Sequence, residues 1–164
     1  MAQAPKWRNG NRRLGAEVYD GPAATYEHAT GERSSYGINN WVYNPPPSVA
    51  DIQGRPTKYN WRTISVPGVS NIPLFLDSMW RGGGPNHTDR PPQYNGEWAG
   101  AGAEMHHFCI DRHKGGINGL FMDSSVRKIG LKELWKLKWH KEFDTASKRT
   151  WPWPPWMQNY RNYE

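Results

Sequence analysis

The residues most able to support chemistry lie in the segment RHKGGINGLFMDSSVRKI, positions 112–129. His113 and Asp123 stand ten positions apart here, and imidazole with carboxylate is a common pairing in acid–base and metal sites. A catalytic pair must meet at hydrogen-bond distance, but an intervening strand would hold the two residues roughly 20–30 Å apart at ~3.3 Å per residue. The spacing therefore favours structural roles, in which Asp123 accepts N–H groups of a turn and His113 bonds a loop carbonyl.

The composition of this segment is that of a β-hairpin. A Gly-Gly pair precedes residues 117–122, a short apolar run of strand composition. Asp123 and Ser124 supply turn chemistry, and residues 125–129 follow as a second strand. We predict a hairpin here and no catalytic dyad.

Nearby histidines and carboxylates offer a metal site as an alternative. Imidazole and carboxylate are ordinary ligands of zinc and other transition metals. Alternate residues of a strand share one face, so three of these side chains could face one ion. The spacing matches no recognised zinc finger, and we expect no cofactor in the leading interpretation. The ligands of the alternative are His107, Asp111 and His113, with His106 beside them and His87 and Asp89 as additions from the preceding loop.

Cys109 is the only cysteine, so no disulfide can form within the chain. Its apolar neighbours Phe108 and Ile110 are typical of a small buried hydrophobe rather than of a nucleophile. No coherent catalytic set emerges from the sequence, and we predict that the protein is not an enzyme.

Length and composition predict one loop-rich domain. The 164 residues suffice for a single modest core, and ten Trp, seventeen Gly and fourteen Pro favour short strands around a few large rings. The net charge of +6 comes from residues 112–149, with ten Lys and Arg against four Asp and Glu. This is typical of a solvated face, and we expect no nucleic-acid binding. No segment is apolar for long enough to span a membrane or to form a signal peptide, which predicts a soluble chain.

The chain divides into three parts by pattern. Residues 1–34 are polar and glycine-rich and are expected to be irregular. Residues 150–164 contain three Pro and three Trp and are expected to be extended. Residues 35–149 are predicted to form the globular, β-rich domain.

Within that domain, three further strands are predicted from short β-branched and aromatic runs. They are residues 35–44, residues 71–80, expected to be covered on both faces, and residues 105–111. Residues 81–104 have no period and are rich in Gly and Pro, which predicts a long loop able to carry a partner surface.

Residues 131–143 are predicted to form an amphipathic helix of about three turns. Leu131, Trp135, Trp139 and Phe143 recur every four residues, so the helix would pack this stripe on the sheet. The predicted fold class is α+β: a small antiparallel sheet or meander with one C-terminal amphipathic helix, rich in loops.

The histidine, nine intervening residues and aspartate, followed by a strand and LKELWKLKWHKEF, resemble the bacterial prepilin-type processing-associated H-x9-DG proteins. This pseudopilin-like family is one in which a membrane-embedded N-terminal helix carries a small β-rich domain. The resemblance spans residues 35–145, including SYGINNWVYN and NIPLFLDSMW upstream. The motif positions in the expected order are His113, Gly115, Asn118, Phe121 and Asp123.

The chain departs from the family pattern at two points. Ser124 stands where the family name has glycine, so the turn loses the residue that best tolerates positive φ, and the loop is expected to be longer or of another type. The leader and hydrophobic helix are also missing, and we expect the chain to be a fragment of a longer reading frame.

The resemblance implies a non-enzymatic structural or interaction domain, similar to the globular head of a pseudopilin. Its partners would be proteins of a pilus-like or type II secretion assembly, in the cell envelope or outside the cell. An alternative is a module that binds carbohydrate or an envelope polymer, because flat indole rings stack on sugar faces. The tryptophans expected to do so are Trp80, Trp98, Trp151, Trp153 and Trp156.

Overall fold

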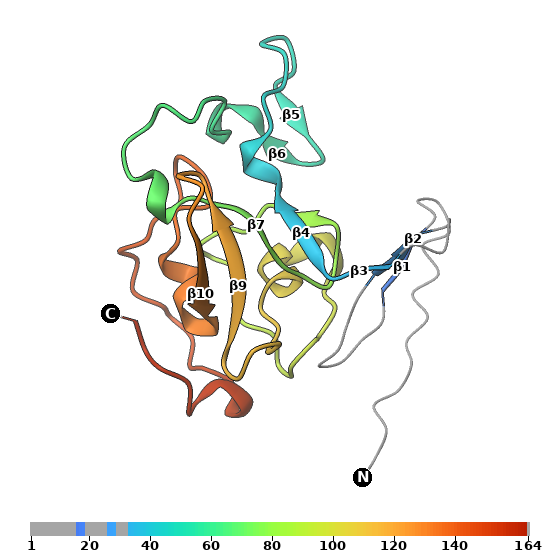
Figure 1. Cartoon of the computed structure of the whole chain (residues 1–164), viewed down its shortest axis with the longest axis vertical. Helices are drawn as coiled ribbons and strands as arrows, with labels where there is room; N and C mark the ends of the chain where they lie inside the picture. The colour runs from blue at the N-terminus through green and yellow to red at the C-terminus, as the bar shows by residue number, and fades with distance from the viewer. Residues whose placement is uncertain (1–15, 19–25, 29–32, 164) are drawn as a thin grey trace.

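The computed structural model describes residues 16–18, 26–28 and 33–163 (Figure 1). The described part is mostly β and loop-rich, and its centre is a five-stranded sheet of order β10-β9-β7-β4-β8. Neighbouring strands run antiparallel except β4 and β8, which are parallel. The sheet is therefore mixed, where a purely antiparallel sheet was predicted. Its strands are β4 (Tyr36–Asn39), β7 (Pro73–Asp77), β8 (Gly82–Gly83), β9 (Gly116–Phe121) and β10 (Val126–Gly130).

Two smaller sheets complete the strands. One has the order β1-β2-β3 and lies in the N-terminal part that was expected to be irregular, although residues 1–15, 19–25 and 29–32 are outside the described residues. The other is the two-stranded ribbon of β5 and β6, at the top of Figure 1. The bounds are β1 (Ala16–Val18), β2 (Tyr26–His28), β3 (Arg33–Ser34), β5 (Asp51–Ile52) and β6 (Arg55–Pro56).

All helices in the described part are short 3₁₀ turns, so the long amphipathic helix predicted for residues 131–143 is wrong. Only its first half is helical, and the chain becomes extended at Leu137. The turns are η1 (Asn40–Val42), η2 (Thr57–Tyr59), η3 (Val69–Asn71), η4 (Gly100–Gly102), η5 (Glu104–His107), η6 (Leu131–Lys136) and η7 (Pro155–Met157).

Side chains from other segments explain why the helix ends early. Asn71 donates its side-chain amide to the Lys136 carbonyl, and its own carbonyl accepts the Lys138 N–H, both at 2.9 Å. The Trp139 carbonyl accepts from the side chains of Asn39 and Trp61, each at 3.0 Å. The backbone groups of residues 136, 138 and 139 therefore have hydrogen-bond partners in other segments of the domain. They do not need the i to i−4 bonds of a continued α-helix to be satisfied.

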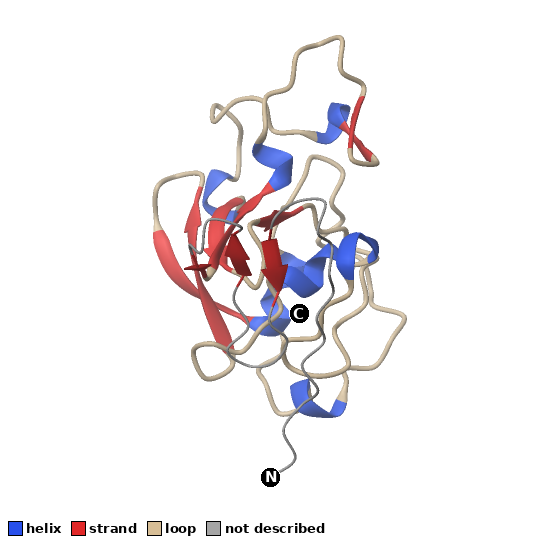
Figure 2. Ribbon diagram, turned by 90° about the vertical axis from the view of Figure 1, so that its right-hand side faces the viewer, coloured by secondary structure: helices blue, strands red, loops and turns tan. Residues whose placement is uncertain are grey.

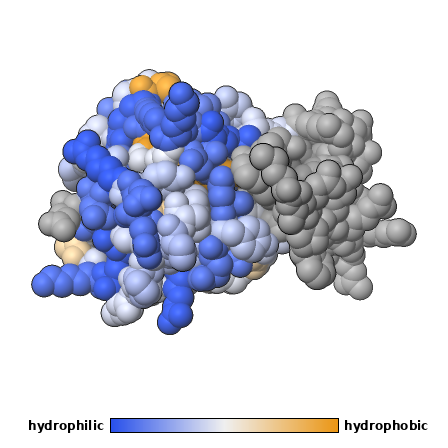
Figure 3. Space-filling model, turned by 90° about the horizontal axis from the view of Figure 1, so that it is seen from below, coloured by the Kyte–Doolittle hydropathy of each residue, from blue (hydrophilic) through white to orange (hydrophobic). Residues whose placement is uncertain are grey.

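The predicted apolar stripe is nevertheless buried, because Leu131, Trp135, Trp139 and Phe143 all lie in the core. They pack in one core with residues of the inner sheet face, which are Leu76, Ile117, Phe121 and Ile129. Figure 2 shows several of the short helices and much of the irregular chain on one side of the five-stranded sheet, and another short helix beside the β5–β6 ribbon at the top. Figure 3 shows that the lower face of the molecule, outside the grey atoms, is predominantly hydrophilic.

Two strand predictions need correction. Residues 105–111 form η5 and irregular chain, and Phe108, Cys109 and Ile110 are all fully buried instead of alternating. The 71–80 segment does contain β7, but the sheet is not covered on both faces, since Phe75 is 43% exposed on the outer face.

The predicted hairpin of β9 and β10 is confirmed, with Val126 opposite Leu120 and Gly130 opposite Gly116. Ser124 has φ +67° and follows a turn in which its N–H donates to the Phe121 carbonyl at 2.9 Å. The chain therefore keeps a tight three-residue loop with a left-handed last residue, although that residue is serine.

Replacing Ser124 with glycine should raise the free energy of unfolding by about 0.5–1 kcal/mol, because glycine adopts positive φ without steric cost. Urea unfolding measures the change. Ser125→Gly is the matched control and should destabilise, since Ser125 donates from both N and Oγ to the Asp123 carboxylate. Equal effects of the two substitutions would contradict the strain at position 124.

Candidate functional site

His113 pairs with the carboxylate of Asp77, not with Asp123. Asp77 ends β7, and its Oδ2 lies 2.9 Å from His113 Nε2, within ion-pair distance. The same oxygen accepts a hydrogen bond from the Asn118 N–H at 2.7 Å. The Asp77 side chain is 3% exposed and the His113 side chain 43% exposed. The imidazole thus covers a buried carboxylate at the outer face of the sheet. His113 does bond a carbonyl of the Gly-Gly segment, but through its backbone N–H, which donates to Gly116 at 3.0 Å.

Arg112 lies beside this pair. Its guanidinium donates to the Ser78 carbonyl at 2.8 Å. Burial lowers the pKa of Arg112, while the negative charge of Asp77 opposes that shift. The Ser78 hydroxyl, which follows Asp77 in the chain, is buried and donates to the His107 carbonyl at 2.8 Å. The Ser78 hydroxyl, the one nearest in sequence to Asp77, is therefore engaged in a structural hydrogen bond.

The remaining motif residues build the hairpin. Gly115 has φ +85° and lies against the ring of Tyr160, and Phe121 is fully buried. Asp123 accepts from Ser125 N at 3.0 Å and Ser125 Oγ at 2.6 Å, as predicted for a turn carboxylate. These hydrogen bonds hold the pKa of Asp123 below its usual range.

The three residues of the alternative metal site are engaged separately. His107 bonds the carbonyls of Gly82 at 2.9 Å and Gly100 at 3.2 Å, and burial lowers its pKa. Asp111 accepts the Tyr160 hydroxyl at 2.6 Å; burial first, and then this bond, raises the pKa of Tyr160 to about 12. Within residues 16–18, 26–28 and 33–163, no group of three or more His, Cys, Asp or Glu side chains could hold a metal ion.

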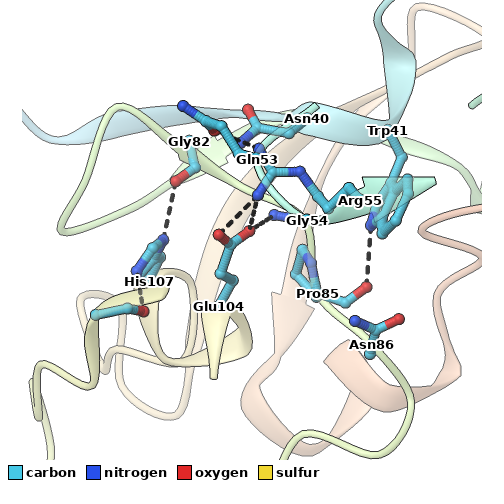
Figure 4. Close-up of polar contacts among 12 residues, drawn as sticks. Asn40, Trp41, Gln53, Gly54, Arg55, Gly82, Pro85, Asn86, Glu104 and His107 are labelled. Atoms are coloured by element: carbon cyan, nitrogen blue, oxygen red, sulfur yellow. Dashed lines mark hydrogen bonds and ion pairs between the residues drawn. The ribbon is translucent and has the colours of Figure 1, made fainter. Parts of the chain in front are cut away.

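A second polar network, drawn in Figure 4, was not found from the sequence. Arg55 of β6 donates from one guanidinium nitrogen to both carboxylate oxygens of Glu104, at 2.8 and 3.0 Å. Glu104 also accepts the Gly84 N–H, and His107, three residues further on, holds Gly82. Isolated Arg and Glu residues at a separation of 49 positions carry no pattern that would have shown this pair.

This network fastens residues 81–104, the segment predicted to be a long loop able to carry a partner surface. Asp89 adds to it by accepting the N–H groups of Asn86 and Met105, each at 3.1 Å, and burial raises its pKa to about 6. The Trp135 indole donates to the Asp89 carbonyl at 2.8 Å. The segment is irregular as predicted except for β8 and η4, and the carboxylates of Asp89 and Glu104 bond backbone and side-chain groups of the domain.

The tryptophans predicted to stack on sugars fall into two groups. Trp80 and Trp98 have ring centroids 5.2 Å apart, and Trp98 is stacked on His107 at 4.6 Å. The C-terminal three pack against the core: Trp153 lies 5.3 Å from Trp135. Trp156 donates its indole N–H to the Pro92 carbonyl at 2.9 Å, and Trp151 is the third of this group.

Lys132 holds the C-terminal segment and was also missed. Its side chain is buried, and Nζ donates to the carbonyls of Gln158 at 3.1 Å and Tyr160 at 2.8 Å and to Asn162 Oδ1 at 2.9 Å. Cys109, in contrast, behaves as predicted: it is fully buried, and burial raises the pKa of its thiol.

Comparisons with known proteins add no relative: no family model matches the chain, and no curated protein or solved structure is significantly similar to it. In the described part of the chain, no helix has the length and apolar character that crossing a membrane requires. Function is therefore inferred from the geometry of the domain itself.

Proposed function

We propose that this chain is a non-enzymatic structural and interaction domain, similar to the globular head of a bacterial pseudopilin. It acts in the cell envelope or outside the cell, within a pilus-like or secretion assembly. Its partners in that assembly are proteins.

The observation that supports this proposal is the use of the H-x9-D segment. His113 and Asn118 fasten β9 to Asp77 of β7, Gly115 allows the entry turn, and Asp123 closes the hairpin turn. The motif residues thus make structural contacts that join the hairpin to the sheet. Such contacts keep the sheet rigid, and a rigid sheet can present a binding surface to a partner. The outer face of that sheet carries exposed apolar side chains, Phe75 and Val126 among them.

The proposal is tested by cross-linking mass spectrometry of the tagged full chain in an envelope fraction of its source cells, with an unrelated tagged domain of equal size as the control. We expect reproducible adducts with subunits of a filament or secretion assembly, and migration above the monomer on a native gel. Recovery as an uncomplexed monomer would contradict the proposal. So would turnover of a substrate that both Asp77→Asn and His113→Gln abolish.

A second candidate function, glycan binding, is favoured by one observation, the pairing of Trp80 with Trp98. Arg81 lies over the Trp80 ring at 5.3 Å and adds a donor beside it. If this pair binds sugar, cell-wall oligosaccharides should quench indole fluorescence in the parent protein and not in Trp98→Ala. Unchanged fluorescence across a panel of oligosaccharides excludes this function.

A further inference from the structure

The open edge of β10 is the feature that carries this inference. β10 lies at one end of the five-stranded sheet, and in the described part of the chain it pairs with β9 alone (Figure 1). The ring of Tyr163 covers Gly130, the last residue of β10, so closely that a Cβ added to Gly130 would collide with it. The open edge is therefore the stretch from Val126 to Lys128.

The hydrogen-bond register shows which backbone groups face outward. The Phe121 N–H donates to the Ser125 carbonyl at 2.9 Å, so these two residues form a hydrogen-bonded pair of the antiparallel ladder. Such pairs alternate with non-hydrogen-bonded pairs, which places Val126 and Lys128 among the latter. Their N–H and C=O groups point away from β9, as the N–H of Gly130 does in reaching Glu133 at 3.1 Å.

An apolar row on the outer sheet face begins at this edge. Val126 is 71% exposed and stands opposite Leu120, which in turn stands opposite Phe75. Tyr36 stacks on Phe75 with ring centroids 5.8 Å apart. A strand added beside β10 would find apolar side chains on its flank, in addition to the outward N–H and C=O groups of Val126 and Lys128, for which residues 16–18, 26–28 and 33–163 supply no backbone partner.

The charge beside the row is positive. Lys128 and Lys114 are exposed, and Lys128 Nζ donates to the Lys114 carbonyl at 3.3 Å. The Asp77 carboxylate of this face is buried under His113. In antiparallel pairing with a second copy, a register centred on Val126 would run into the hairpin loop at Ser124. Registers centred on Arg127 or Lys128 would place that residue opposite its own equivalent, and like charges directly opposite each other are destabilising. An acidic strand meets no such cost.

We propose that the β10 edge binds an extended, acidic segment of a partner protein by strand addition. In that segment an apolar residue stands opposite Val126, and a carboxylate two positions along stands opposite Lys128. This inference rests on the proposed function and names the partner chemistry of the same domain.

Two labelled peptides test it, Thr-Val-Thr-Glu-Thr-Val-Thr and the same peptide with Lys in place of Glu, each titrated by fluorescence anisotropy. The parent protein should bind the Glu peptide about tenfold more tightly than the Lys peptide, in keeping with one favourable against one unfavourable cross-strand charge pair. Lys128→Glu should invert that preference. Both peptides bound equally by parent and variant, or neither bound by the parent, would overturn the proposal.

Val126→Pro provides the backbone test. Proline is tolerated at the first residue of an edge strand where its missing N–H faces solvent, so the fold should survive with an unchanged circular dichroism spectrum. Binding of the Glu peptide should fall at least tenfold, because a donor to the added strand is lost. Undiminished binding by Val126→Pro, or a concentration-dependent dimer of the parent protein in sedimentation, would overturn strand addition by a partner. If Val126→Pro still forms the cross-linked adducts, the proposed interaction function holds and only strand addition at the β10 edge is contradicted.

Discussion

Replacing Trp139 with alanine is expected to lower the free energy of unfolding by about 3–5 kcal/mol, the range for truncation of a large buried aromatic ring. Trp139 is fully buried, with its ring 4.9 Å from that of Phe108 between centroids. Its indole N–H donates to the Leu134 carbonyl at 2.8 Å, so the substitution also removes this buried hydrogen bond. Urea or thermal unfolding measures the loss, which is a large share of a small domain's stability.

Lys141→Ala is the matched control, because Lys141 lies two residues away and is exposed. It should change stability by less than about 0.5 kcal/mol, as surface substitutions usually do. A Trp139→Ala protein as stable as the parent would remove the 131–143 segment from the core.

Replacing Asp77 with alanine is expected to lower the free energy of unfolding by about 2–4 kcal/mol, because it removes the acceptor of the half-buried Asn118 N–H and the negative charge that faces the His113 imidazole. His113→Ala should cost only about 1 kcal/mol, since the side chain is half-exposed and the Asn118 N–H keeps its bond to Asp77. Asp77→Ala should be the more destabilising substitution, because it leaves the Asn118 N–H without its acceptor and His113→Ala does not.

A double-mutant cycle of Asp77→Ala and His113→Ala separates the pair from its surroundings. The coupling should be at least about 0.5 kcal/mol, as for residues in direct contact. Asp123→Ala with His113→Ala is the control cycle, and its effects should add, because Asp123 bonds Ser125 within its own turn and not His113. Additive losses in the Asp77 cycle would show that the imidazole and carboxylate do not stabilise each other.

These results bear on function as well as stability. If the Asp77–His113 pair stabilises the fold, the motif holds the β9–β10 hairpin against β7. It thereby fixes the position of the outer sheet face and of the β10 edge. A pair that could be broken without loss of stability would favour a chemical role instead. The stabilities of Asp77→Ala and His113→Ala therefore also test the proposed function, which requires the motif to be structural.

Local patterns were sufficient to predict the hairpin and the residues that would be buried near the C-terminus. The hairpin depends on a Gly-Gly pair, an apolar run and a turn carboxylate, which are neighbours in sequence. The burial of Leu131, Trp135, Trp139 and Phe143 follows from their apolar character in any conformation that reaches the core. The same spacing predicted an α-helix, which the chain does not form.

The sequence by itself thus determined a loop-rich β domain, a hairpin over residues 116–130, and the apolar stripe that covers the sheet. Tertiary structure alone decided that the stripe follows a 3₁₀ turn and an extended chain, that β8 joins β4 in parallel, and that His113 meets Asp77. The reason is the distance in sequence between the groups involved. Asn39 reaches the Trp139 carbonyl across 100 positions, and bonds of that separation outweigh local preference only once the chain is folded.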